Sequence, residues 1–129
     1  MAVARSFYEA MARGEFPAAL LDAAVEYVNP PGAIEPGVRR GIEELRIVIE
    51  TVREGWETWD MEPEELTAVG DQVVVVIRYR ARGRTSGVEL EGRESALITF
   101  RDGKIARYEW FQGPGDALEA AEARGEASD

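Results

Sequence analysis

The chain has 129 residues, of which 31% are charged and 45% hydrophobic, and this balance fits a single globular domain with a substantial core. Its formal net charge of −10 argues against non-specific nucleic-acid binding, which needs clustered Lys and Arg to neutralise phosphates. Because Cys and His are absent, disulfides, thiolate nucleophiles and a Ser-His-Asp triad are excluded, and the usual zinc sites are not expected.

No apolar run approaches the roughly 20 residues of a membrane span, and residues 1–5 carry no apolar segment typical of a signal peptide. We therefore expect no membrane partner and a cytoplasmic location. Acid–base chemistry in this chain would fall to Asp, Glu, Tyr or Arg.

The first 41 residues predict two helices, a short strand and a loop. Apolar residues recur at helical spacing over residues 1–13, and Gly14 stands where a helix C-cap belongs. A short second helix begins near Pro17. Residues 24–29 alternate loosely and indicate a strand, and the Pro- and Gly-rich residues 30–41 indicate a loop.

The clearest helix begins at Ile42, where one face is apolar and the other carries Glu and Arg, and it ends at Gly55. Trp56 and Trp59 follow in a segment whose structure the pattern does not decide. These two rings either cap a pocket or cover the core.

From about residue 62 the hydrophobic period changes to two, which predicts strands over residues 62–68, 72–84, 89–101 and 104–112. Pro63 confines the start of the first of these to a sheet edge. Asp102-Gly103 separates the last two strands and is a strong hairpin signal. A short terminal helix over residues 116–124 completes one domain, 1–124, and residues 125–129 are expected to fray. Helices followed by an antiparallel meander indicate an α+β fold.

Several short motifs occur in an order and spacing typical of one family. They are Arg13-Gly14-Glu15-Phe16, Glu35-Pro36 before the helix opened by Gly41, Gly70-Asp71-Gln72-Val73-Val74, and Phe100-Arg101-Asp102-Gly103-Lys104-Ile105. With them the chain resembles the SnoaL-like branch of the nuclear transport factor two-like superfamily, which includes polyketide cyclases, ketosteroid isomerase and limonene epoxide hydrolase.

The resemblance implies a cone-shaped α+β barrel, in which about three N-terminal helices pack on the concave face of a curved, largely antiparallel (mixed) sheet. It also implies a deep apolar pocket and a homodimer joined through the outer face of the sheet. On the strand predicted over residues 72–84, that outer face would carry Val74, Val76, Arg78 and Arg80.

The catalytic groups of those relatives are missing here. Asn29 stands at the place of the isomerase's general base, Ala96 at that of its protonated Asp, and Phe7, next to Tyr8, at that of its oxyanion Tyr. The acid and Arg positions of the epoxide hydrolase hold apolar residues on the strand from Val73 to Ile77, together with Gln112. SnoaL-type cyclases rely on Asp and His, and the chain has no His.

Glu94 is the candidate acid or base. It shares one strand face with Ala96, Ile98 and Phe100, so burial would raise its pKa toward the range useful for proton transfer. The alternative is that Glu94 lies in water at the strand end or pairs with Arg93 or another Arg. Glu109, which the resemblance turns outward, is expected to face a dimer partner or to pair with Arg78 and Arg80.

The resemblance turns Tyr108, Trp110 and Gln112 inward, as an aromatic wall with polar tips; plain core packing is the alternative. Asn29 either holds a ligand carbonyl or stabilises the turn before Pro30. The predicted pocket residues are, in full, Tyr8, Asn29, Trp56, Val75, Ile77, Tyr79, Ala96, Tyr108, Trp110 and Gln112.

Two functions remain open. The first is an isomerase-, cyclase- or hydrolase-type enzyme for a small hydrophobic or aromatic ligand, with Glu94 as acid or base and Tyr8, Tyr79 or Tyr108 as hydrogen-bond donors. The second is a non-catalytic ligand-binding or dimerisation module of the same fold. Neither requires a cofactor or a metal.

Overall fold

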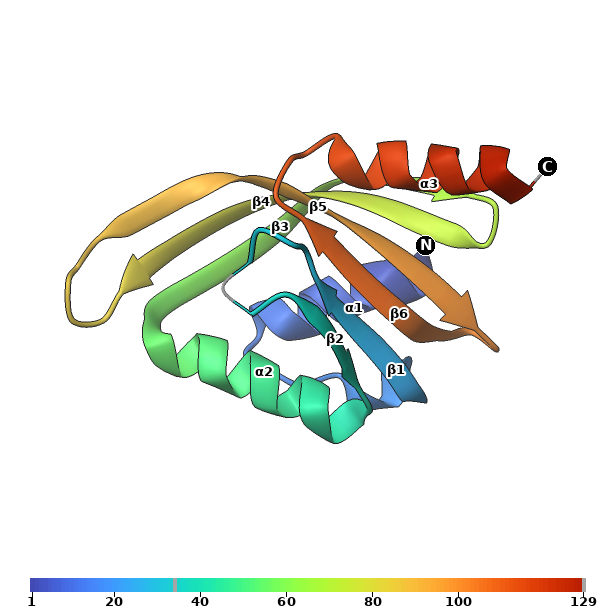
Figure 1. Ribbon diagram of the computed structural model, residues 1–129. Helices are drawn as coiled ribbons and strands as arrows, with labels where there is room; N and C mark the ends of the chain where they lie inside the picture. Colours follow the sequence, from blue (N-terminus) through green and yellow to red (C-terminus); the bar gives the residue numbers. More distant parts are fainter. Residues whose placement is uncertain (34, 129) are drawn as a thin grey trace.

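The computed structural model describes residues 1–33 and 35–128, the last four by backbone only, and its centre is one curved six-stranded sheet (Figure 1). The strand order is β2-β1-β6-β5-β4-β3, and only β1 and β6 pair in parallel, so the sheet is mixed and its edges β2 and β3 stay unjoined. The strands are β1 (Leu21–Asn29), β2 (Gly37–Arg40), β3 (Trp56–Val69), β4 (Gln72–Gly83), β5 (Glu89–Arg101) and β6 (Lys104–Phe111).

Helices lie on both sides of this sheet. On the concave side are α1 (Ala2–Ala12) and α2 (Ile42–Gly55), while α3 (Asp116–Ser128) lies on the convex side (Figure 1). The predicted α+β class is confirmed. Of the three expected N-terminal helices, the second is a single 3₁₀ turn, η1 (Ala18–Leu20), because Leu21 already belongs to β1. Among the described residues no helix is long and apolar enough to cross a membrane.

Several predicted boundaries differ from the structure because tertiary pairing decided them, among them the start of β1 at Leu21 instead of residue 24. The loop predicted over residues 30–41 contains β2, whose four residues are too few to show a period and pair with the end of β1. Trp56 and Trp59, left unassigned, begin β3. Pro63 lies inside this edge strand at a register shift, where its missing N–H is tolerated.

The C-terminal helix α3 also differs, since it extends to Ser128 and not to Arg124. The side chains of residues 125–129 lie outside the described part of the chain, and so does the backbone of Asp129, so the predicted frayed tail stays a prediction.

The predicted Asp-Gly hairpin joins β5 to β6. Asp102 has φ 50° and Gly103 has φ 77°, so both lie in the left-handed region that the favoured two-residue hairpin turns require. This turn sets the register that places Ala96 beside Trp110 and Ile98 beside Tyr108. The inward residues of β6 are therefore Tyr108 and Trp110, as predicted.

The core fills the concave face where α1 crosses the sheet. Phe7 and Tyr8 of α1 pack in one buried cluster with the inward side chains of β4, β5 and β6. Leu45 and Ile49 join it from the apolar stripe of α2. As a result, α1 contributes both to this core and to the wall of the adjoining open space, where Phe7, Tyr8 and Met11 are lining residues.

The convex face is partly covered by α3. Ala117 and Ala121 pack on Val74 and Leu97, so Val74, expected to need a partner or solvent, is buried within the chain. Ser95 Oγ donates to the Gly113 carbonyl oxygen at 2.6 Å and accepts from the Ala117 N–H at 3.1 Å, which ties the start of α3 to β5.

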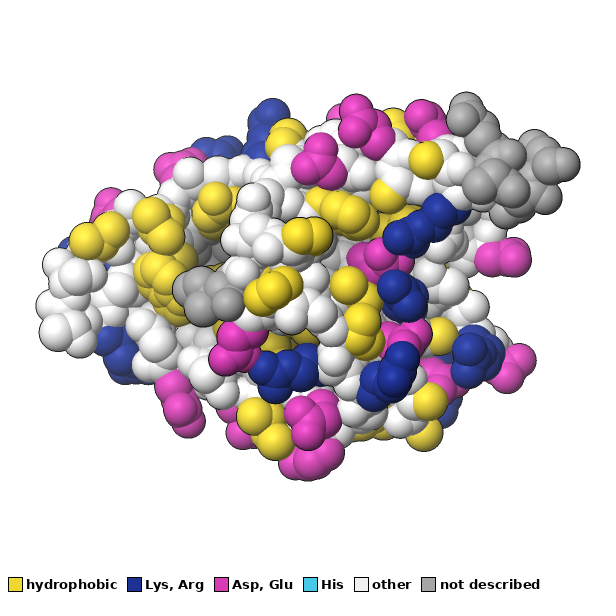
Figure 2. All heavy atoms as spheres, viewed as in Figure 1, with side chains coloured by type: hydrophobic (Ala, Val, Ile, Leu, Met, Phe, Trp, Pro, Cys, Tyr) yellow, Lys and Arg dark blue, Asp and Glu magenta, His cyan; other side chains and the backbone are white. Residues whose placement is uncertain are grey.

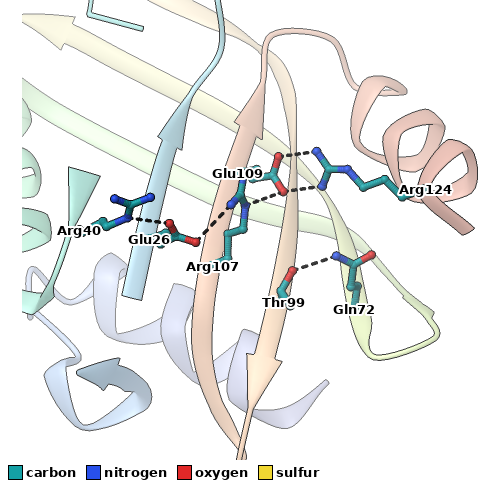
Figure 3. A network of polar contacts seen from close by, with 7 residues as sticks. All are labelled: Glu26, Arg40, Gln72, Thr99, Arg107, Glu109 and Arg124. Carbon is teal, nitrogen blue, oxygen red and sulfur yellow. Dashed lines mark hydrogen bonds and ion pairs between the residues drawn. The ribbon is translucent and has the colours of Figure 1, made fainter. Parts of the chain in front are cut away.

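Glu109 fastens the other end of α3 (Figure 3). Arg124 donates two hydrogen bonds to its carboxylate, at 2.6 and 2.9 Å, and Arg107 donates a third at 3.0 Å. The predicted partners Arg78 and Arg80 are wrong, because they pair with Glu91 while α3 brings Arg124 over β6. The dimer expected through this face stays a prediction.

Arg124→Met should lower the free energy of unfolding by about 1–3 kcal/mol, since it removes a charged partner from a buried carboxylate. Burial raises the pKa of Glu109, but the hydrogen bonds from Arg124 and the charge of Arg107 outweigh it and hold the pKa below its usual value. The stabilisation is therefore present above the ordinary glutamate pKa and lost as pH falls below it.

Urea unfolding at pH 7 and pH 3 measures both effects, and Arg101→Met, at an exposed arginine at the end of β5, is the matched control. Equal stabilities of the two variants at pH 7 would show that α3 does not depend on Glu109.

Candidate functional site

A cavity of about 970 Å³ opens on the concave side, between the sheet and helices α1 and α2. This volume lies at the upper end of the range for small-molecule sites, roughly 300–1,000 Å³. Apolar side chains gather on the β3–β5 end of the sheet, beside α2 (Figure 2). The cavity is therefore an apolar hollow of ligand size with an opening to solvent.

Most of the predicted pocket residues line this cavity. They are Tyr8, Asn29, Trp56, Tyr79, Tyr108, Trp110 and Gln112, and the candidate acid or base Glu94 lines the cavity with them. Val75, Ile77 and Ala96 do not, although they face inward as predicted. All three are fully buried, because the side chains of α1 already fill the space in front of them.

Glu94 faces the cavity from β5, directly beside Ile77 of β4. Its side chain is half-buried, and desolvation raises its pKa to about 7. Among the described residues, none forms a hydrogen bond or ion pair with its carboxyl group. Arg93, the suggested partner, points to the convex face and pairs with Glu64 at 2.9 Å, because successive residues of a strand face opposite sides.

Two tyrosine hydroxyls meet at the inner end of the cavity. Tyr8 Oη and Tyr108 Oη are 2.7 Å apart, and either can be the donor. Since one hydrogen bond uses one of the two protons, the other hydroxyl proton remains available. Burial, with a further contribution from the charge of Glu94, raises the pKa of both phenols, so they stay protonated and act as donors.

Tyr27 is a cavity residue that the sequence analysis missed. Its ring stacks on that of Tyr108, with centroids 5.8 Å apart and an angle of 11° between the planes. Burial and the charge of Glu94 raise its pKa. The available signal was its position two residues before Asn29 on one strand, since i and i+2 share a face.

The amide of Asn29 is occupied within the protein. Trp110 Nε1 donates to its Oδ1 at 2.7 Å, and its Nδ2 donates to the Glu35 carbonyl oxygen at 2.9 Å. Asn29 thus fixes the Trp110 ring and the following loop, as the turn-stabilising alternative proposed. Gln112 lies beyond the end of β6, exposed at the cavity mouth against Gly32.

The wall near Glu94 depends on a glycine. Tyr79 lies opposite Gly92 on β5, and a Cβ at that position would come within 2.6 Å of the tyrosine hydroxyl. Gly92 therefore makes room for the Tyr79 ring to lie across β5, two residues from Glu94. Further out, the rings of Trp56 and Trp59 lie 6.0 Å apart and line the outer part of the cavity.

Residues 4–108 match the family model of the SnoaL-like domain. The chain belongs to this family. A search of curated proteins found no match.

Solved structures share the SnoaL-like fold over almost the whole chain. An NTF2-like protein from Burkholderia pseudomallei is 22% identical, with a TM-score of 0.79, and the alignment covers 92% of this chain and 94% of that one. TerC, co-crystallised with polyporic acid, is 21% identical with a TM-score of 0.77, covering 93% and 95%. A candidate SnoaL-like polyketide cyclase from Jannaschia is 16% identical with a TM-score of 0.75, covering 94% and 90%.

In this SnoaL-like domain the described cavity residues supply the unpaired carboxyl of Glu94 and several phenol donors, while the second lining carboxyl, that of Glu35, pairs with Arg39. A carboxyl with a pKa near 7 is populated in both protonation states at neutral pH, so it can either accept or donate a proton. The phenols can donate hydrogen bonds to an oxygen on which negative charge develops. Together these groups suit proton transfer.

Replacing Glu94 by Gln should change how stability depends on pH. The pKa of Glu94 is raised from 4.5 to about 7, so between these values the folded state holds a proton that the unfolded state has lost. Wild-type stability therefore decreases as pH rises through this window, and Glu94→Gln should gain stability relative to the wild type between pH 5 and pH 8.

Urea unfolding at both pH values is the measurement, and Glu89→Gln, at an exposed glutamate of the same strand, is the control. Parallel pH profiles of wild type and Glu94→Gln would mean that Glu94 is fully hydrated.

Proposed function

We propose that this SnoaL-like protein binds a small hydrophobic or aromatic molecule in the concave cavity and transfers a proton to or from it through Glu94. The observation that carries the proposal is a carboxyl group with a pKa of about 7 that faces an apolar cavity of about 970 Å³. Such a group combines access to a ligand with a pKa matched to neutral pH.

For a ligand with a carbonyl group, the chemistry is as follows. The Glu94 carboxylate removes a proton from the carbon next to the carbonyl, and the electrons of the C–H bond move onto the carbonyl oxygen. A hydroxyl of Tyr27 or of the Tyr8–Tyr108 pair donates a hydrogen bond to that oxygen. If the carbonyl is β,γ-unsaturated, return of the proton from Glu94 to the γ-carbon shifts the double bond and completes an isomerisation. If the ligand has a second carbonyl, attack of the enolate carbon on that carbonyl carbon forms a ring, and Glu94 returns the proton to the resulting alkoxide oxygen.

A second candidate function is ligand binding without catalysis. It is favoured by hydrogen bonds that occupy polar groups of the cavity. Asn29 binds Trp110 and the Glu35 carbonyl oxygen, and Tyr8 binds Tyr108, so few polar groups remain to assist Glu94 in catalysis. The co-crystallisation of TerC with polyporic acid supports a ligand-binding cavity under either function.

Proton exchange on 2-tetralone, a flat hydrophobic ketone, tests the enzymatic function. In D₂O the protein should accelerate exchange of the protons next to the carbonyl, with a rate that rises with pH and levels off above about 7. Glu94→Gln should reduce the rate at least about 100-fold, and Tyr27→Phe by about tenfold or more, because each removes one group from the transition state.

Proton NMR follows the exchange, and tryptophan fluorescence follows binding in the same samples. Glu89→Gln should leave both unchanged. Binding without any exchange in the wild type would exclude this proton transfer and support the non-catalytic function.

A further inference from the structure

We propose that the ligands this cavity selects are hydrophobic monocations, that is, quaternary or protonated amines with an aryl or branched alkyl body. The inference rests on the proposed function for the place of binding and for the access of Glu94 to the ligand. It adds the charge of the ligand, which the proposed function leaves open.

Glu94 differs from the other charged side chains that line the cavity. Four charged side chains line it: Glu35, Arg39, Arg53 and Glu94. The first three have partners within the protein, since Arg39 pairs with Glu35 and, at 3.8 Å, with Glu44. Arg53 donates hydrogen bonds to backbone carbonyl oxygens at the C-terminal end of α1, those of Met11, Gly14 and Glu15. Within the described residues, Glu94 is thus the charged lining side chain that has neither a hydrogen-bond nor an ion-pair partner.

The groups that face Glu94 from the other elements are uncharged at neutral pH. They are the phenols of Tyr8 on α1, Tyr27 on β1 and Tyr108 on β6, whose pKa values are all raised, together with the amide of Gln112 at the mouth. Desolvation alone accounts for the raised pKa of Glu94, and no cation offsets it. A positive ligand would supply that missing charge, whereas a negative one would meet the carboxylate without compensation.

An aromatic surface lies beside the Glu94 carboxylate. Tyr79 on β4 and Trp110 on β6 flank Glu94 diagonally on the two neighbouring strands, and both are half-exposed to the cavity. Trp56 and Trp59 continue the wall toward the mouth. The faces of such rings attract cations, most strongly when water is excluded.

The net charge of the protein and the apolar residues at the cavity mouth also favour an amphipathic cation. The net charge of −10 attracts cations from solution at low ionic strength. At the mouth, Ile47 and Leu90 line the cavity yet are 48% and 45% exposed, so they offer apolar surface to the uncharged part of a ligand. These features together favour an amphipathic cation over a small inorganic one.

A pair of ligands with the same shape tests the inference. Phenyltrimethylammonium carries a permanent charge that pH cannot change, and tert-butylbenzene is its neutral isostere. At pH 8 and low salt the wild type should bind the cation at least tenfold more tightly, as measured by tryptophan quenching. Glu94→Gln should abolish most of this preference. Tyr79→Leu should lower the affinity for the cation more than the affinity for the isostere.

Glu94→Asp and Glu89→Gln are the matched controls and should keep the preference. Between pH 6 and pH 8 the affinity for the cation should rise in the wild type and stay flat in Glu94→Gln. Equal affinity for the two ligands, an unchanged preference in Glu94→Gln, or no binding of the cation would each overturn the inference.

The two proposals fail separately. Proton exchange on the ketone without a preference for the cation would support the proposed proton transfer and contradict the proposed class of ligand. A preference for the cation without any exchange would do the reverse.

Discussion

Burial of strand β5 on both faces is the constraint on which the rest of the structure depends. On the convex side, Leu97 lies under α3, and Ser95 binds the backbone at the start of that helix. On the concave side, Ala96 and Ile98 lie under α1. Because alternate residues of one strand serve the two faces, any change of register in β5 would disturb both the helix anchor and the cavity.

The same strand explains why one carboxyl group can have a pKa near neutrality. Toward Ile98, the concave face of β5 is filled by the side chains of α1, and toward Glu89 it is open to solvent. Glu94 lies at the boundary between these regions, where it loses part of its hydration but stays accessible to a ligand. Glu109, on β6, shows the opposite outcome, since a buried carboxylate held by arginines has a lowered pKa.

The family relationship accounts for the cavity but not for its chemistry. The position that resembles an acid of ketosteroid isomerase holds Ala96, which is buried in the core, whereas the carboxyl group that faces the cavity, Glu94, is two residues earlier on the same face. The place of the isomerase's base holds Asn29, which orients Trp110. The proton transfer that we propose would therefore depend on Glu94 and its phenol neighbours, and the same carboxyl group is the basis for the positive charge that we propose for the ligand.

Local patterns in the sequence were sufficient for the elements that signal strongly by themselves: the amphipathic α2, the Asp102-Gly103 turn, and the alternation that places Glu94 on one face with Ala96 and Ile98. The inward direction of Trp110 came only from the family resemblance, because the alternation of β6 fits either face. Local patterns could not reveal β2, which is a strand only because β1 pairs with it. Nor could they reveal the partner of Glu109, Arg124, which lies 15 residues further along the chain on α3. Nor could they separate Val75 and Ala96, which α1 covers, from Tyr79 and Glu94 on the same face, which it leaves open. Periodicity determines which way a side chain faces; only the packing of distant elements decides whether it meets another side chain, water or a cavity.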